Sequence, residues 1–302
     1  MPFQSPQLAK TFDPKKPPKF PVFVEPKLDG LRAYVIPATG QVFSRNGKPF
    51  QNFGHIVEQL KSIPEAMNYV FDGEALAVTN DWNESASIAR GSNRASDAEK
   101  LHFHAFDIIP LKDFEEGRIP VMTQSNRSNL LNKIIGTSLK NIHVPKSVKV
   151  DSIEEVMTAG KKFLIDGFEG AMVKNPNGLY KYGKRSNDWM KVKFSLDEDM
   201  IIIGVDEGDG KLKGLLGTFI MERSDGTRCR CGIGTNESLN DNARSEYWKM
   251  HQRGELIGTV GEFRFERTEK IGVRFPRFLR LRFDKTAEDV RSSNDGAIKI
   301  KG

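Results

Sequence analysis

A lysine near the start of the chain stands directly after a short apolar run and beside a turn-forming pair. The residues are Lys27-Leu28-Asp29-Gly30, followed by Arg32, and the preceding run 20–24 has the composition of a β-strand. Asp-Gly pairs are common in turns and have no chemical meaning by themselves. An amine held in a pocket near other cations has a lowered pKa, because its charged form is desolvated and repelled, and it then becomes a nucleophile. Lys27 is therefore a candidate nucleophile.

Two further segments place charged groups at strand ends. Asp72-Gly73-Glu74 lies in the β-rich stretch 69–78, and the apolar strand 169–174 begins with Glu169 and ends with Lys174. Interior strands rarely carry Glu or Lys at their ends without a partner. We therefore expect each of these charged groups to have one.

Two basic strands complete the set of chemically informative segments. Lys191 and Lys193 lie on one face of the strand 189–193, because side chains alternate along a strand. Like charges on one face repel unless an anion lies between them, and a phosphate is the obvious candidate. In 274–285, Arg280 and Arg282 alternate with apolar residues.

The net charge of +6 is unevenly distributed. Residues 195–302 hold 19 basic and 19 acidic side chains, so the whole excess lies in 1–194. The stretch 264–285 is nevertheless basic within the neutral part. This pattern indicates a polyanionic partner such as nucleic acid or nucleotide phosphates, with a solvated, charged strand pair as the alternative.

Periodic patterns predict the elements that position these residues. In 1–194, helices at 56–63, 125–135 and 152–164 alternate with β-rich stretches, and Ser152 with Glu155 forms a capping box. The segment 80–100 reads as a polar loop, and 1–19, rich in proline and lysine, as a flexible arm. Downstream of 195, five short strands and one helix near 239–251 fit an all-β OB-fold barrel. The predicted fold class is α+β.

Other features exclude several classes of protein. No run of about 18 apolar residues predicts a transmembrane helix, and the first twenty residues lack the apolar segment of a secretory signal. We therefore expect a cytoplasmic location. Cys229 and Cys231 are too close for an unstrained disulfide and too few for a structural zinc site, so we predict inert thiols in a strand.

Taken in order, the five segments resemble the motifs of the ATP-dependent DNA ligases, within the covalent nucleotidyltransferase superfamily. The likeness runs from about residue 22 to 285 and is to the minimal two-domain form found in phages, viruses and some bacteria. It implies a nucleotidyltransferase (adenylation) domain at 1–194, with antiparallel sheets and flanking helices, and an OB-fold domain at 195–302.

The resemblance also implies roles for individual residues at the nucleotide. Lys27 corresponds to the adenylated lysine, and Arg32 belongs to the same motif. Glu25 lies where the family reads adenine, and Phe106 where an aromatic residue stacks on it. The remaining implied roles are ribose or metal binding by Glu74, metal binding by Glu169, and phosphate contacts by Lys174, Lys191 and Lys193.

Further implied contacts involve DNA and the leaving group. Ser44-Arg45-Asn46-Gly47 is similar to the motif whose arginine contacts the 5′-phosphate strand, and we expect Arg90 and Arg94 to contact DNA phosphates as well. The stretch 274–285 is similar to the motif that acts on pyrophosphate, which assigns that role to Arg280, Arg282 and Lys285.

The predicted function is ATP-dependent sealing of nicks in duplex DNA, through a lysyl-adenylate and a DNA-adenylate. The expected cofactors are ATP and a divalent metal, Mg²⁺ or Mn²⁺, and the expected state is a monomer. An RNA ligase or a capping-type guanylyltransferase is the enzymatic alternative. A single-strand-binding OB module is the non-enzymatic one, although it leaves Lys27 and Glu74 without a role.

Overall fold

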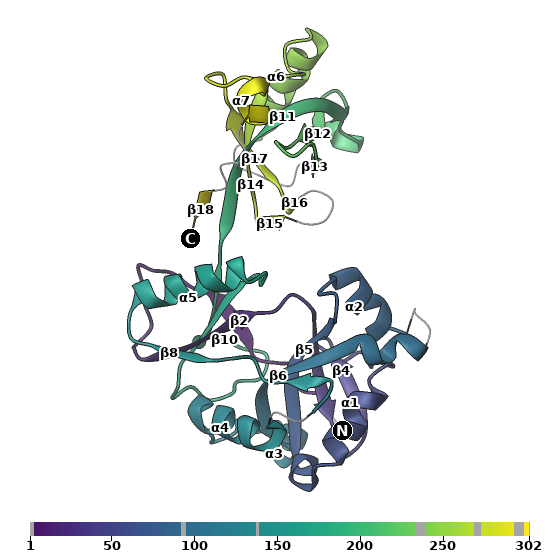
Figure 1. Cartoon of the computed structure of the whole chain (residues 1–302), viewed down its shortest axis with the longest axis vertical. Coiled ribbons are helices and arrows are strands. Elements are labelled where there is room, and N and C mark those ends of the chain that lie inside the picture. Colours follow the sequence, from purple (N-terminus) through teal and green to yellow (C-terminus); the bar gives the residue numbers. More distant parts are fainter. Residues whose placement is uncertain are drawn as a thin grey trace. The chain divides into compact units, whose positions relative to one another are not determined.

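The computed structural model describes residues 3–91, 95–136, 139–232, 240–268, 273–292 and 299–301. The chain divides into two compact units, Met1–Lys193 and Phe194–Gly302, and each has its own sheets (Figure 1). Among the described residues, no helix is long and apolar enough to cross a membrane.

One sheet of the first unit contains the predicted nucleophile and the two basic lysines. Helix α5 (Ile153–Ile165) packs on β2 (Val22–Lys27), β9 (Gly170–Lys174) and β10 (Arg185–Lys193) of this sheet. The predicted capping box is confirmed, because the Ser152 side chain accepts a hydrogen bond from the Glu155 N–H at 3.1 Å. The strand order is β1-β10-β9-β2-β8, formed by Leu8–Thr11, Arg185–Lys193, Gly170–Lys174, Val22–Lys27 and Val148–Val150.

The second sheet separates two apolar clusters, because its side chains alternate between faces. On β3 (Leu31–Ile36), Ala33 and Val35 join a cluster with α1 (Gly54–Lys61), α2 (Trp82–Ala89) and α4 (Gln124–Ile135). Tyr34 and Ile36 join a second cluster that includes Trp189 of β10, so this cluster connects the two sheets. The strand order is β4-β3-β5-β6-β7, formed by Gln41–Ser44, Leu31–Ile36, Tyr69–Ala77, Leu101–Pro110 and Ile142–His143. The short elements are η1 (Pro64–Asn68), η2 (Ala95–Lys100) and α3 (Leu111–Glu116).

The prediction of a flexible arm at 1–19 is wrong for its central part. Strand β1 pairs in parallel with β10, the side chain of Gln7 is fully buried, and Phe12 is buried as well. The partner strand lies more than 170 residues further along the chain, so no local pattern indicates the pairing. A second parallel pair, β6 with β7, makes both sheets mixed and not purely antiparallel as predicted.

The predicted loop at 80–100 contains α2 and η2. Helix α2 begins after Asp81, whose side chain accepts the Glu84 N–H at 2.8 Å, and it buries Ala86, Ile88 and Ala89. This helix is short and two of its four buried residues are alanine, so its periodicity is weak in the sequence. Burial against the second sheet stabilises it.

The second unit has one main sheet, in the order β13-β12-β11-β14-β17, with β18 also paired to β11. Within the described ranges this path does not close into the predicted barrel. The described part of this unit contains the predicted helix, α6 (Asp241–Gln252), and a further helix that the sequence pattern does not predict, α7 (Ala287–Ser292). The strands of the main sheet are β13 (Arg228–Gly232), β12 (Leu216–Glu222), β11 (Ser195–Glu207), β14 (Val260–Phe265), β17 (Arg277–Leu281) and β18 (Lys299–Lys301). The other short elements are η3 (Gly210–Leu212) and the separate pair β15 (Arg267–Thr268) and β16 (Val273–Arg274).

Candidate active site

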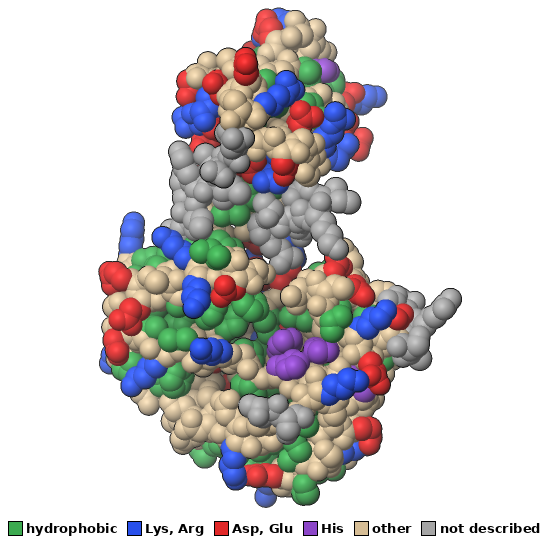
Figure 2. Space-filling model, viewed as in Figure 1, with side chains coloured by type: hydrophobic (Ala, Val, Ile, Leu, Met, Phe, Trp, Pro, Cys, Tyr) green, Lys and Arg blue, Asp and Glu red, His purple; other side chains and the backbone are tan. Residues whose placement is uncertain are grey.

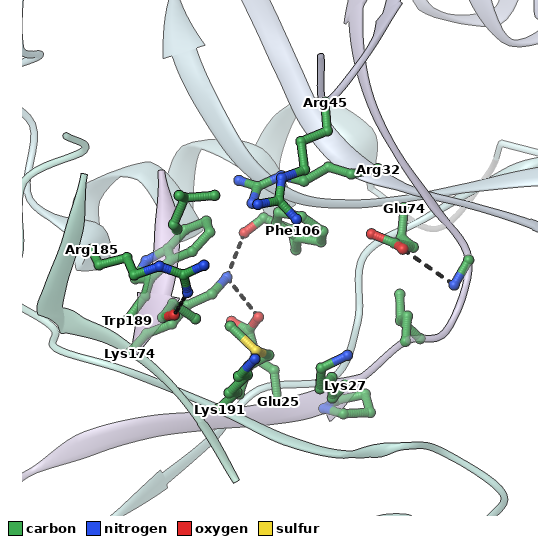
Figure 3. Close-up of a pocket in the computed structure, with 16 residues that line it drawn as sticks. Glu25, Lys27, Arg32, Arg45, Glu74, Phe106, Lys174, Arg185, Trp189 and Lys191 are labelled. Atoms are coloured by element: carbon green, nitrogen blue, oxygen red, sulfur yellow. Dashed lines mark hydrogen bonds and ion pairs between the residues drawn. The ribbon is translucent and has the colours of Figure 1, made fainter. Parts of the chain in front are cut away.

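A cavity of about 350 Å³ in the first unit is lined by strands of both sheets (Figure 3). It collects residues that are far apart in the sequence, because β2, β9 and β10 are neighbours in one sheet and β3, β5 and β6 in the other. The predicted site residues that line it are Glu25, Lys27, Arg32, Arg45, Glu74, Phe106, Lys174 and Lys191.

Lys27 ends strand β2, opposite Gly170 of β9. Its Nζ forms an ion pair with Glu169, and the Nζ of Lys193 contacts the other oxygen of that carboxylate at 2.7 Å. Burial raises the pKa of Glu169, but Lys27 and Lys193 lower it more, so the net pKa lies below its usual value. Glu169 is therefore a carboxylate that holds two of the predicted cations together.

Gly170 permits the close approach of β9 and β10 at this point. Its φ is +146°, and a Cβ atom built there would lie 2.3 Å from the carbonyl oxygen of Val192. A side chain is therefore excluded, which explains why glycine follows Glu169.

The alternation predicted for Lys191 and Lys193 is confirmed, because both are partly exposed on β10 while Val192 between them is buried. Burial lowers the pKa of Lys191, and the charges of Lys193, Lys27 and Arg185 lower it further. The repulsion among these cations is the property expected of a site that receives an anion.

Another part of the cavity is aromatic and contains a buried ion pair. Lys174 is almost fully buried, and its Nζ lies 2.7 Å from Oε2 of Glu25 and donates to the backbone oxygen of Phe106 at 2.8 Å. The same Nζ lies 5.1 Å from the centre of the Phe106 ring and 4.8 Å from that of Trp189. Burial raises the pKa of Glu25, and Lys174 opposes this rise. The aromatic walls and the paired charge suit a planar heterocycle with polar edges.

Phe106 occupies an irregularity in the strand pairing. Asp72 of β5 pairs with Asp107, whereas the next residue, Gly73, pairs with Ala105, so Phe106 has no partner on β5. Such bulges redirect a side chain out of the regular alternation. The bulge lies where Phe106 lines the cavity.

Glu74 is a second carboxylate in the cavity. Its Oε1 accepts the Gly30 N–H at 3.2 Å, and burial raises its pKa to about 7, although Arg32 and Lys27 oppose the rise. Within the described part of the chain, no group of three or more His, Cys, Asp or Glu side chains is arranged to hold a metal. The predicted ligands Glu74 and Glu169 therefore fit a hard divalent cation only if nucleotide phosphates or waters supply further oxygens, as is usual for Mg²⁺.

Two of the predicted DNA contacts line a second cavity of about 680 Å³ in the first unit. Arg45 lines both cavities, and Arg90 lines the second, with its guanidinium carbon 5.8 Å from the ring centre of Trp82. Arg94 lies outside the described residues.

The cations predicted to act on pyrophosphate lie in the second unit, on or just after β17. Arg280 donates to Glu262 at 2.8 Å, Arg282 donates to Asp199 at 2.9 and 3.0 Å, and Lys285 donates to Asp199 at 2.6 Å. Each of these cations is therefore paired with an acid of its own unit.

Sequence reasoning missed several residues that line the first cavity. Trp189 and Arg185 lie on the same strand as Lys191, so the alternation along β10 could have indicated them. Leu8 and Ala9 belong to β1, within the segment whose composition predicts a flexible arm.

The fold and the cavity define a nucleotidyltransferase with an appended OB-like domain. The model of the ATP dependent DNA ligase domain family matches residues 6–193, and that of the DNA ligase OB-like domain matches 207–282. The chain belongs to the ATP-dependent DNA ligase family.

Individual relatives agree with this family. DNA ligase 2 of Methanosarcina acetivorans is 29% identical over 88% of this chain and 52% of its own length, so the chain spans about half the length of the curated relatives it matches. A solved structure named Pmar-Lig_Pre is 30% identical, covers 94% of this chain and 68% of its own, and has a TM-score of 0.71. A structure of the Lig E DNA ligases, 23% identical with a TM-score of 0.68, covers 92% of this chain and 99% of its own and shares the fold.

Proposed function

We propose that this chain is an ATP-dependent DNA ligase that joins the 3′-hydroxyl and 5′-phosphate ends of nicks in duplex DNA. Family membership supports the proposal. The observation that carries it is that Lys27 lines one cavity with the aromatic ring of Phe106 and the cation of Lys191. A nucleophile, a base-sized recess and a phosphate-binding charge are the three parts that nucleotidyl transfer needs.

In the first step, Nζ of Lys27 attacks the α-phosphorus of ATP. A nitrogen–phosphorus bond forms while the bond to the pyrophosphate oxygen breaks. Lys27 must lose a proton before it attacks, and Glu169 is the carboxylate in contact with that ammonium group. Lys191 and Lys193 offset the negative charge that builds up on the phosphoryl oxygens.

In the second step, the adenylate passes from Lys27 to the 5′-phosphate at the nick, and in the third the 3′-hydroxyl displaces AMP. Arg45 is suited to bring the two substrates together, because it lines both cavities. The DNA phosphates would occupy the second cavity, with Arg45 and Arg90 as their partners. We expect Arg94, on the same segment, to contribute as well.

A divalent cation, Mg²⁺ or Mn²⁺, would neutralise phosphate charge when bound. Glu74 and Glu169 are the carboxylates that would hold it. Glu25 and Lys174 would bind the adenine edge while Phe106 stacks on its face, and Arg32 completes the nucleotide site.

The two units would have different roles in the reaction. Residues 1–194 would form the adenylation domain and 195–302 the OB-fold domain, with the chain acting as a monomer on nicked duplex DNA. Arg280, Arg282 and Lys285 would exchange their carboxylate partners for the pyrophosphate group during the first step.

Replacement of the nucleophile tests this proposal. Lys27→Ala should abolish covalent labelling by α-labelled ATP, because it removes the attacking amine, yet it should still close a nick that already carries the 5′-adenylate. Lys133→Ala, at an exposed lysine paired with Glu65, is the matched control and should label normally. Retained labelling of the Lys27 variant would place the nucleophile elsewhere.

Parallel reactions with other nucleotides and with nicked RNA distinguish a DNA ligase from the alternative enzymes. Wild-type protein should be labelled by ATP and not by GTP, and NAD should not support sealing. Sealing of nicked RNA but not of nicked DNA would indicate an RNA ligase.

A further inference from the structure

A buried hydrogen-bond network beneath the nucleotide cavity converges on the guanidinium of Arg32. Its Nε and Nη2 donate to the two oxygens of Asp72 at 2.9 and 2.6 Å, and Nη1 donates to the backbone oxygen of Gln7 at 2.7 Å. The guanidinium carbon lies 5.3 Å from the ring centres of both Phe106 and Trp189. Arg32 is therefore constrained by hydrogen bonds to Asp72 and Gln7 and by its contacts with two aromatic rings.

The hydroxyl of Tyr180 is the centre of this network. Tyr180 is fully buried and donates its one hydroxyl proton to Oδ2 of Asp72 at 2.5 Å. Because that proton is committed, the short contact with the Tyr34 hydroxyl at 2.7 Å requires Tyr34 to donate. The Gln7 N–H also donates to the Tyr180 oxygen, at 3.2 Å.

We propose that Tyr180 is a positioning residue for Arg32 in nucleotidyl transfer, acting through the carboxylate of Asp72 and through the hydrogen bond that its oxygen accepts from Nη2 of Arg32 at 3.4 Å; this inference rests on the proposed function. Asp72 is fully buried, and a buried carboxylate needs every available donor. Without the phenol proton, the side-chain donors that the structure gives to Asp72 are the Nε and Nη2 of Arg32 itself, so the carboxylate loses its restraint from outside the pair. The guanidinium then keeps one anchor to the surrounding fold, the hydrogen bond from Nη1 to the Gln7 oxygen.

The segment at the start of strand β1 belongs to the same hydrogen-bond network. Gln7 supplies a carbonyl to Arg32 and an N–H to Tyr180, while its side-chain oxygen accepts the Lys181 N–H at 2.6 Å. The amino-terminal segment thereby connects the guanidinium to the loop that carries Tyr180. Leu8 and Ala9, the next two residues, line the cavity directly.

The test removes one oxygen atom. Tyr180→Phe keeps the ring, which packs edge-on against Trp189 at 5.8 Å, and deletes the proton given to Asp72. Tyr34→Phe is the matched control, because the Tyr34 hydroxyl contacts Tyr180 and not Asp72 in the hydrogen bonds of the structure. Tyr180→Phe should slow single-turnover lysyl-adenylate formation at saturating ATP by about 10- to 100-fold, and Tyr34→Phe should leave it within about threefold of wild type.

A double-mutant cycle distinguishes positioning from general structural damage. In an Arg32→Ala background, Tyr180→Phe should have no further effect on the adenylation rate, because the group it positions is gone. Equal losses in the two backgrounds would overturn the proposal.

A second readout does not depend on activity. In protein labelled with ¹⁵N-arginine, Tyr180→Phe should accelerate hydrogen exchange at the Nε–H of Arg32 and leave that of Arg127 unchanged. Arg127 is the internal reference, because its Nε donates to Asp107 at 2.7 Å in a fully buried pair. An unchanged rate of hydrogen exchange at the Nε–H of Arg32 would contradict the positioning role of Tyr180. Absence of adenylation by the wild type would instead refute the proposed function, with the exchange measurement still deciding the role of Tyr180.

Discussion

Single side chains at this site depend on partners that other strands supply. Glu169 holds the Nζ groups of both Lys27 and Lys193, and Glu25 holds the Nζ of the buried Lys174. An unpaired buried charge would cost several kcal/mol, so each carboxylate determines where its lysine can stay. The acids are thus as important to the arrangement of the cavity as the cations that would contact phosphate.

Three histidines form a cluster outside the cavity, at β6 and β7. Nδ1 of His102 lies 2.9 Å from Nε2 of His143, and the rings of His104 and His143 have centres 5.2 Å apart; Figure 2 shows histidine side chains gathered on one face of the first unit. Burial lowers the pKa of His104 to about 4, with the charges of His143 and His102 adding to the effect. Burial also lowers the pKa values of His102 and His143.

This cluster predicts an acid-sensitive first unit. The unfolded chain takes up protons near the ordinary histidine pKa of about 6.5, whereas folded His104 resists protonation until about pH 4, so the free energy of unfolding falls as pH decreases between these values. The slope approaches about 1.4 kcal/mol per pH unit for each proton that the folded state excludes. His104→Gln should flatten this dependence, because glutamine does not titrate.

Urea unfolding at several pH values checks this prediction. A Trp248→Phe background leaves Trp82 and Trp189 as reporters of the first unit. His251→Gln, in the second unit, is the control and should follow the wild-type curve. Parallel pH curves for His104→Gln and wild type would contradict the prediction.

At the scale of elements, the register between neighbouring strands assembles the cavity. Strand β9 lies between β2 and β10, so Gly170 faces Lys27 on one side and Lys193 on the other. On the second sheet, the bulge at Phe106 and the hydrogen bond from Gly30 to Glu74 position two side chains that line the same cavity. A change in register at one of these places would move several functional groups together.

A substitution at Gly170 tests whether the register of β9 and β10 positions the functional groups. Gly170→Ala should lower the free energy of unfolding of the first unit by about 3 kcal/mol, because it combines an unfavourable φ with a collision against the β10 backbone. It should also reduce adenylation by displacing Lys193. Gly54→Ala is the matched control, because a Cβ atom there meets nothing within 4 Å, and in a helix it should be neutral or slightly stabilising. Equal unfolding midpoints for the two variants would show that β9 and β10 can separate at this point.

Across the whole molecule, the balance of charge differs between the units. The neutral second unit has its acidic run on β11, where Asp197, Glu198 and Asp199 each pair with an arginine. Those partners are Arg264, Arg223 and Arg282. Part of its basic strand is thus neutralised internally, and the unbalanced positive charge belongs to the first unit.

This distribution predicts a salt dependence for binding to nicked DNA. The logarithm of affinity should fall linearly with the logarithm of salt concentration, because phosphate contacts release counterions. Arg45→Ala and Arg90→Ala should each reduce the slope by about one. Fluorescence anisotropy with a labelled nicked duplex measures it, and Arg118→Ala, whose arginine pairs with Asp113 and Glu116, is the control. Slopes equal to wild type would remove the two arginines from the DNA contact.

Many of the elements could be predicted from local pattern. The capping box before α5 and the helix at 125–135 depend on neighbours in the sequence, and both are present. The grouping of Lys27, Glu74, Phe106 and Lys191 came from the order of motifs, and these residues do line one cavity. Their chemical roles remain predictions.

Tertiary structure alone decided the features that depend on distant partners. Strand β1 is stabilised by β10, and α2 by its burial against the second sheet, so neither has a strong local signal. The network of Arg32, Asp72 and Tyr180 spans 148 residues. The sequence determined which groups could do chemistry, because residue type and order are local properties. Which groups restrain them was decided by the fold, because hydrogen bonds and ion pairs depend on distance in space.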